Sequence, residues 1–328
     1  MRPFAVSVPI LSLGMLLRLL AVEPAPTQGT PSTNSFGLTQ DGRWLMQPGS
    51  GRYDASALLR LPDGRLLTVN DKEVPPCVIV FGTNHMARLV PERKWFPMDA
   101  VRAAAGRARY APDIEGLAID EQGRLYICTE GPRWIFRTDA NGQAVERLPI
   151  DWTPVKRWFS TNDANASWEG IAVGGNRLYV ANERSTGRIV EVDLSTFQVV
   201  HDFQVAPQGN TSADVHYSDL SWFAGELWVL CRDVRKILRV APSTRSVIAE
   251  YDFAAAELSP QNIYLTGLPY GFAEGLSVDA THLWVAFDNN GMPRRSAPTD
   301  FRPLLLRFPR PDRPVPSTGQ GPIPTPHP

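Results

Sequence analysis

The feature that most constrains the fold is a hairpin pattern that occurs five times along the chain. One copy, DIEGLAIDEQGRLYICTE at residues 113–130, has two short apolar runs separated by Gln122-Gly123, with an acid near each end. Short runs rich in strand-favouring residues, with a turn signal between them, predict a β-hairpin. Because the two ends of a hairpin meet at one edge, Glu115 and Glu130 should lie side by side. The other copies lie at residues 54–71, 169–183, 218–233 and 274–288.

A third apolar run follows every copy, and most copies add a fourth. Four-stranded units that repeat every 50 to 60 residues or so predict an all-β fold, a β-propeller. Five blades can be counted. The fifth lacks an outer strand because prolines begin at Pro309, so we expect the segment Ser35–Leu45 to supply it and close the ring. A sixth, degenerate blade in the connections 95–110, 151–166 or 254–272 stays possible.

The two ends of the chain differ in composition from the repeats. Residues 1–30 contain Arg2 and an apolar run from Phe4 to Val22, which is typical of a secretory signal peptide, with a membrane anchor as the alternative. We therefore expect an exported protein, periplasmic or secreted, that meets the membrane only through an uncleaved N-terminal segment. The propeller domain should span residues 35–310, and the proline-rich residues 311–328 should form a disordered tail. The net charge of −1 gives no global basic field for nucleic acid.

The acids of the repeats predict a metal site. In a propeller the first strand of each blade lines the channel, so ring closure should gather Glu115, Glu169 and Glu274 at one mouth, with Asp71 and Asp288 near them. Converging carboxylates repel one another unless they are protonated or bind a cation. Oxygen ligands favour Ca²⁺, or Mg²⁺ or another divalent ion, and the five scattered histidines argue against zinc. The alternative is structural: each Glu-Gly pair could hydrogen-bond neighbouring amides and fix blade packing.

The turns after the second strands carry basic residues, among them Lys72, Arg133, Arg184 and Arg235. A ring of such bases around a cation would suit a small anionic molecule such as a phosphorylated one. Exposed turns also favour charged residues without any function, so this alternative stays open.

Several stretches resemble a known family. DIEGLAIDEQGRLYICTEGPRWIFR, LLTVNDK and GFAEGLSVDATHLWVAFDNN are similar to the propeller family described as esterase-like activity of phytase, and to the SdiA-regulated propellers. The resemblance covers roughly residues 50 to 310. It implies an exported, calcium-binding propeller with phosphatase or esterase chemistry. Carried over to this sequence, it implies metal ligands at the five acids named above, although Ser56 and Ser218 replace the glutamate in two copies.

With that chemistry, Glu115, Glu169, Arg133 and Arg184 are the catalytic candidates, and Lys72, Arg133, Arg184 and Arg235 the substrate-binding candidates. Two other functions remain open. One is a metal-dependent lactonase similar to gluconolactonase, because Asn70, Asn182, Asn289 and Asn290 accompany the carboxylates. The other is a non-catalytic, calcium-stabilised propeller that binds a ligand or a protein. No G-x-S-x-G, H-E-x-x-H or Walker-type motif occurs. We expect a monomer.

Overall fold

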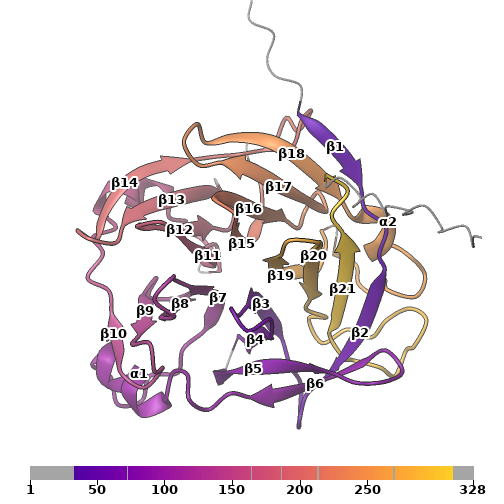
Figure 1. Cartoon of the computed structure of the whole chain (residues 1–328), viewed down its shortest axis with the longest axis horizontal. Helices are drawn as coiled ribbons and strands as arrows, with labels where there is room; N and C mark the ends of the chain where they lie inside the picture. The colour runs from indigo at the N-terminus through magenta and orange to yellow at the C-terminus, as the bar shows by residue number, and fades with distance from the viewer. Residues whose placement is uncertain are drawn as a thin grey trace, which may run out of the picture. The chain divides into compact units, whose positions relative to one another are not determined.

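Each sequence repeat folds into an antiparallel sheet in the computed structural model of this chain, and the predicted β-propeller is confirmed (Figure 1). The structure describes residues 33–312, apart from residues 72, 164, 186, 213 and 269 and the side chains of residues 73 and 74. The predicted signal peptide, and the tail from residue 313 onward, lie outside the described residues.

The described strands sort into five blades of four strands. The first blade contains β3 (Ala55–Arg60), β4 (Leu66–Asn70), β5 (Glu73–Phe81) and β6 (Met86–Pro91). The second contains β7 (Ile114–Ile119), β8 (Leu125–Thr129), β9 (Ile135–Thr138) and β10 (Val145–Arg147). The third contains β11 (Trp168–Gly174), β12 (Arg177–Asn182), β13 (Arg188–Asp193) and β14 (Gln198–Phe203). The fourth contains β15 (Tyr217–Phe223), β16 (Glu226–Cys231), β17 (Lys236–Ala241) and β18 (Ser246–Asp252). The fifth contains β19 (Ala273–Val278), β20 (His282–Phe287), β21 (Leu304–Pro309) and the N-terminal strand β2 (Gly42–Gln47).

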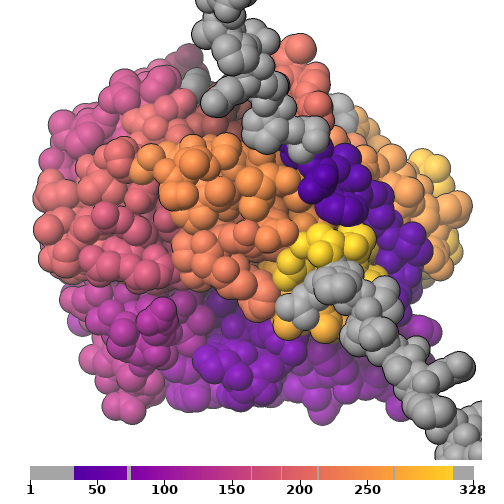
Figure 2. Space-filling view, turned by 45° about the horizontal axis from the view of Figure 1, so that its top comes forward, coloured from indigo at the N-terminus to yellow at the C-terminus, as the bar shows by residue number. Residues whose placement is uncertain are grey.

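Closure of the ring corrects one detail of the sequence prediction. The segment expected to form one strand, Ser35–Leu45, instead contributes to two blades. Strand β2 pairs antiparallel with β21, and its end also pairs in parallel with β6 of the first blade. Strand β1 (Asn34–Gly37) pairs in parallel with β18 as an extra edge strand of the fourth blade. Between the two strands, Leu38 is buried in the core. Figure 2 shows the indigo N-terminal segment lying against the yellow C-terminal one.

The inner strands β3, β7, β11, β15 and β19 surround the centre of the ring (Figure 1). They approach one another so closely that three of them require glycine after the bulge, at Gly116, Gly170 and Gly275. A Cβ atom added to Gly170 would lie 2.4 Å from the Cα atom of Asp219, and one added to Gly116 would lie 2.6 Å from the carbonyl oxygen of Glu169. The glycine of each Glu-Gly pair therefore permits inner strands of neighbouring blades to pack backbone against backbone.

The long connections contain helices where a sixth blade had remained possible. These are α1 (Met98–Ala105), the 3₁₀ helix η1 (Thr153–Trp158) and α2 (Ala254–Glu257). Among the described residues, no helix is both long enough and apolar enough to span a bilayer. Cys77, Cys128 and Cys231 are buried free thiols.

Removal of β2 should unfold the protein, whereas removal of β1 should not. Strand β2 supplies the outer strand of the fifth blade and buries Met46 completely, while the residues of β1 are mostly exposed. We expect a chain that starts at Asp54 to lose cooperative thermal unfolding, and one that starts at Leu38 to lose only about 1 kcal/mol. Equal stability of the Asp54 chain and the longer chain in a denaturant titration would contradict this closure.

Candidate functional site

A β-bulge at the same place in all five inner strands directs side chains into one mouth of the channel. In the second blade, Ile114 pairs with Thr129 and Gly116 pairs with Cys128, which leaves Glu115 as the extra residue. The same register shift occurs at Ser56, Ser218 and Glu274, and at Glu169-Gly170. Bulges re-aim side chains and are common beside active sites. The three glutamates of the sequence pattern are all bulge residues.

Each blade presents three residues at this mouth. The residue directly before the inner strand is Asp54, Asp113, Ser167, His216 or Phe272 in blades one to five. The bulge residue is Ser56, Glu115, Glu169, Ser218 or Glu274. The residue after the second strand is Asp71, Glu130, Glu183, Arg232 or Asp288. Backbone hydrogen bonds fix the arrangement, for example from Asp71 N to Asp54 O (3.1 Å) and from Arg232 N to His216 O (3.2 Å). At these positions the second blade therefore presents three acids and the first, third and fifth blades two each, whereas the fourth blade presents no acid and carries an arginine.

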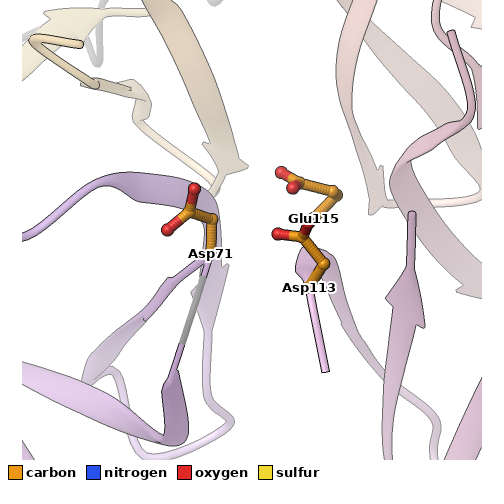
Figure 3. A group of neighbouring side chains, drawn as sticks. All are labelled: Asp71, Asp113 and Glu115. Atoms are coloured by element: carbon orange, nitrogen blue, oxygen red, sulfur yellow. The ribbon is translucent and has the colours of Figure 1, made fainter. Parts of the chain in front are cut away.

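Asp71, Asp113 and Glu115 form a carboxylate group that spans the first two blades. One oxygen of each lies within 4.8 Å of the others. Figure 3 shows the side chains of Asp113 and Glu115 directed toward that of Asp71. A backbone hydrogen bond of 2.7 Å from Ile114 N to Asp71 O ties the two blades together at this point. Burial raises the pKa of Glu115 well above its usual range, and the charges of Glu130, Asp113 and Asp71 raise it further. The group can hold a hard cation.

On the opposite side of the mouth, Arg232 supplies a positive charge from the protein itself. Arg232 forms ion pairs with Glu183 and Glu274, and its side chain is only 11% exposed. Arg184 also pairs with Glu183, and with Asp163 at 3.0 Å. Glu274, a predicted metal ligand, is thus bound by a guanidinium. The pKa of Glu169 is raised by burial and by the charge of Glu115, and is lowered by Arg232.

Asp288, another predicted ligand, lies at the border of the fifth and first blades. Burial raises its pKa to about 8, and the charges of Asp54 and Glu274 raise it further. Within the part of the chain that is described, its buried Oδ1 atom has no hydrogen-bond partner. Beside it, Arg52 pairs with Asp54. A buried carboxyl without a full set of partners is costly to ionise.

The predicted substrate-binding bases are largely engaged by the protein. Arg133 donates to the carbonyl oxygen of Ala166 (2.9 Å) and stacks 4.2 Å from the centre of the Phe159 ring. Arg235 lies 3.5 Å from Glu257, a buried acid whose pKa burial raises to about 7. Arg184 pairs with acids as described above, and Lys72 lies outside the described residues. In the described part of the chain, Arg133, Arg184 and Arg235 therefore contact other protein groups and do not form an open ring around the carboxylates.

Three residues at or near the mouth were missed by the sequence reasoning: Asp113, Arg232 and Asp219. Asp219 replaces the glycine of the fourth repeat, and its carboxylate accepts amide hydrogen bonds from Leu276 (2.7 Å) and Leu58 (3.3 Å). It thereby ties the fourth blade to the fifth and the first. A signal was present, because the fourth repeat has Ser-Asp for Glu-Gly and an arginine where the others have an acid.

Comparisons with known proteins agree with this architecture. The family model described as phytase-like, esterase-like activity of phytase, matches residues 53–291. No curated protein matches the chain. Among solved structures, glutaminyl cyclase from Myxococcus xanthus is similar, with 13% identity, coverage of 85% of this chain and 99% of that one, and a TM-score of 0.52. A streptogramin B lyase has 10% identity, coverage of 81% and 97%, and a TM-score of 0.42. At such identities the likeness concerns the fold alone.

Replacement of Arg232 should be costly because two buried acids would lose their counter-charge. We expect Arg232→Leu to lower the free energy of unfolding by about 3–5 kcal/mol, and Glu274→Gln in the same chain to restore part of it. The control is Arg65→Ala, which removes an exposed pair with Asp63 and should cost at most about 1 kcal/mol. Similar losses in the two arginine variants would show that the Arg232 pairs are not the cause.

The raised pKa of Asp288 predicts a pH-dependent effect in protein without added metal. The folded state keeps the proton of Asp288 up to about pH 8, whereas the unfolded chain loses it near the ordinary value of 3.8. Because the folded state binds more protons, this group lowers stability as pH rises between those values. Asp288→Asn should therefore stabilise the metal-free protein at pH 8 by about 1 kcal/mol or more, and hardly at pH 4.

The control is Asp279→Asn at the opposite end of the same blade. The pKa of Asp279 is lowered to about 2, and its carboxylate accepts amide hydrogen bonds from Thr281 and His282. Its replacement should destabilise at pH 8. Denaturant titrations at both pH values measure each effect, and a destabilising Asp288→Asn at pH 8 would refute the argument.

Proposed function

The chain belongs to the phytase-like family, and on this premise we propose that it is a metal-dependent hydrolase of phosphoric or carboxylic esters. The proposed site is the channel mouth, and the proposed substrate is a small anionic molecule. The N-terminal segment supports export as part of the same proposal, to the periplasm or outside the cell.

The observation that carries the proposal is the carboxylate group of Asp71, Asp113 and Glu115. Its three side chains come from two blades and lie close enough to share one ion. Their donor atoms are all oxygens, which suits Ca²⁺ or Mg²⁺ rather than zinc. Burial and like charge make the ionised group unfavourable on its own, so a divalent cation relieves a cost that the fold itself creates. We propose Ca²⁺, because it tolerates irregular geometry better than Mg²⁺.

A cation held there supplies Lewis-acid chemistry, which polarises the phosphoryl or carbonyl oxygen of an ester. The residues around the ion would have distinct roles in the reaction. Glu169 lies within electrostatic range of both Glu115 and Arg232, and burial and the charge of Glu115 raise its pKa well above the ordinary value, which favours its protonated form. Such a carboxyl can donate that proton to the leaving oxygen. Arg232 and Arg184 hold Glu183 in place, so that the acids beside Glu169 keep their positions.

Divalent metal should stabilise the protein through Glu115. We expect added Ca²⁺ to raise the melting temperature and EDTA to lower it, with about 2.7 kcal/mol gained at a hundredfold excess of ion over Kd. Glu115→Gln should abolish most of the shift. The control is Glu121→Gln, which changes an exposed acid beyond the other end of β7. Absence of any shift with Ca²⁺, Mg²⁺ or Mn²⁺ would refute the metal site.

Turnover separates the enzyme from its non-catalytic alternative. The purified protein should hydrolyse aryl phosphates or aryl esters only with the ion present, and Glu115→Gln should lower kcat/KM by at least about tenfold. Lactones belong in the same assay, because they test the lactonase alternative. Tight ion binding without turnover of any of these substrates would favour the metal-stabilised binding propeller.

A further inference from the structure

A pocket of about 820 Å³ lies between two connections of the first and fifth blades. One wall is the connection from β2 to β3, which contributes Arg52 and Tyr53. The other wall is the connection from β20 to β21, which contributes Gly291, Phe301 and Arg302. The volume lies within the range of small-molecule sites in proteins.

Arg52 joins this pocket to the candidate metal site. Its Nε atom donates to Asp54, and the charges of Asp288 and Asp71 also hold its pKa high. The side chain is nevertheless 56% exposed. A guanidinium has five N–H donors, and the hydrogen bond to Asp54 uses only the one on Nε. The Nη1 atom lies against Gly291, where an added Cβ would approach it to 2.9 Å. Arg52 is thus a cation that lies between the acids and the pocket and has N–H donors that the hydrogen bond to Asp54 does not use.

The second wall is fixed and offers an aromatic surface. Asp300 pairs with Arg302 (2.6 Å) and with Arg294, whose side chain is 3% exposed. The Tyr264 hydroxyl donates to the carbonyl oxygen of Arg302 (3.2 Å). These contacts neutralise Arg302 and hold the loop in place. Between them Phe301 is 52% exposed, so its ring is accessible to a molecule bound in the pocket.

We propose that this pocket binds the organic part of an aromatic phosphate monoester, and that Arg52 positions its phosphate over the carboxylate group. The guanidinium fork matches two phosphate oxygens, a match that a neutral carboxylic ester does not offer. Phe301 packs against the aromatic ring of the same molecule. This inference rests on the proposed function, since it names the substrate class of that site, and it makes Arg52 a positioning residue that the sequence pattern did not single out.

The test compares variants of the full chain with 4-nitrophenyl phosphate and glycerol 2-phosphate as substrates, at saturating Ca²⁺. Arg52→Ala should raise KM for both phosphates by about tenfold or more, and Arg52→Lys by less, because lysine lacks the fork. Phe301→Ala should raise KM for the aryl substrate only. The matched control is Arg65→Ala in the same blade, because Arg65 is also exposed and also pairs with an aspartate two residues away. Its KM should not change.

Direct binding separates failure of this inference from failure of the proposed function. The affinity for phenylphosphonate and the affinity for Ca²⁺ are measured separately by calorimetry. If no substrate turns over but phenylphosphonate binds and requires Arg52, the hydrolase is wrong and the pocket stands. If substrates turn over and KM is unchanged in Arg52→Ala and Phe301→Ala, the pocket is wrong and the hydrolase stands. A wild-type protein that neither hydrolyses aryl phosphate nor binds phenylphosphonate overturns both.

Discussion

Repulsion between buried carboxyl groups is the constraint on which the rest of the channel mouth depends. Three of the five bulges carry glutamates, and the residues after the second strands add further acids. The chain neutralises one side internally, because Arg232 pairs with Glu183 and Glu274. On the other side, the charges of Asp71 and Asp113 still raise the pKa of Glu115. A divalent cation would lower that repulsion, and the oxygens of Asp71, Asp113 and Glu115 lie close enough together to share one.

The close packing of the inner strands is what brings these carboxyl groups together. Glycines after the bulges let neighbouring strands approach until their backbones touch, which brings side chains from different blades within a few ångströms. In the fourth blade Asp219 takes the glycine position and uses its carboxylate as an acceptor for amides of two other blades. Burial raises the pKa of Asp219, while these hydrogen bonds oppose that shift. Asp219 and Glu115 therefore differ in their surroundings, because backbone amides donate to Asp219 whereas the charges of neighbouring carboxylates surround Glu115.

The sequence predicts this fold well because each blade of the propeller is encoded by the same local pattern. Hairpin, turn and terminal acid recur at fixed offsets, so strand order and the position of Glu115 follow from spacing. Contacts between repeats cannot be predicted from this spacing. Arg232 and Asp113 reach their roles through neighbouring blades, and the split of Ser35–Leu45 into two strands depends on which blade edges are open. The partners of Arg133 and Arg235 could not be predicted for the same reason, since they lie in the long connections.

Ring closure and the pocket depend on one stretch of chain. Strand β2 completes the fifth blade, and the residues that follow it carry Arg52 into the pocket before β3 begins the first blade. The opposite wall is the connection that leads into β21, the strand with which β2 pairs. Because both walls of the proposed pocket are continuous in the chain with the paired strands β2 and β21, we expect loosening of this closure to change the spacing between Arg52 and Phe301.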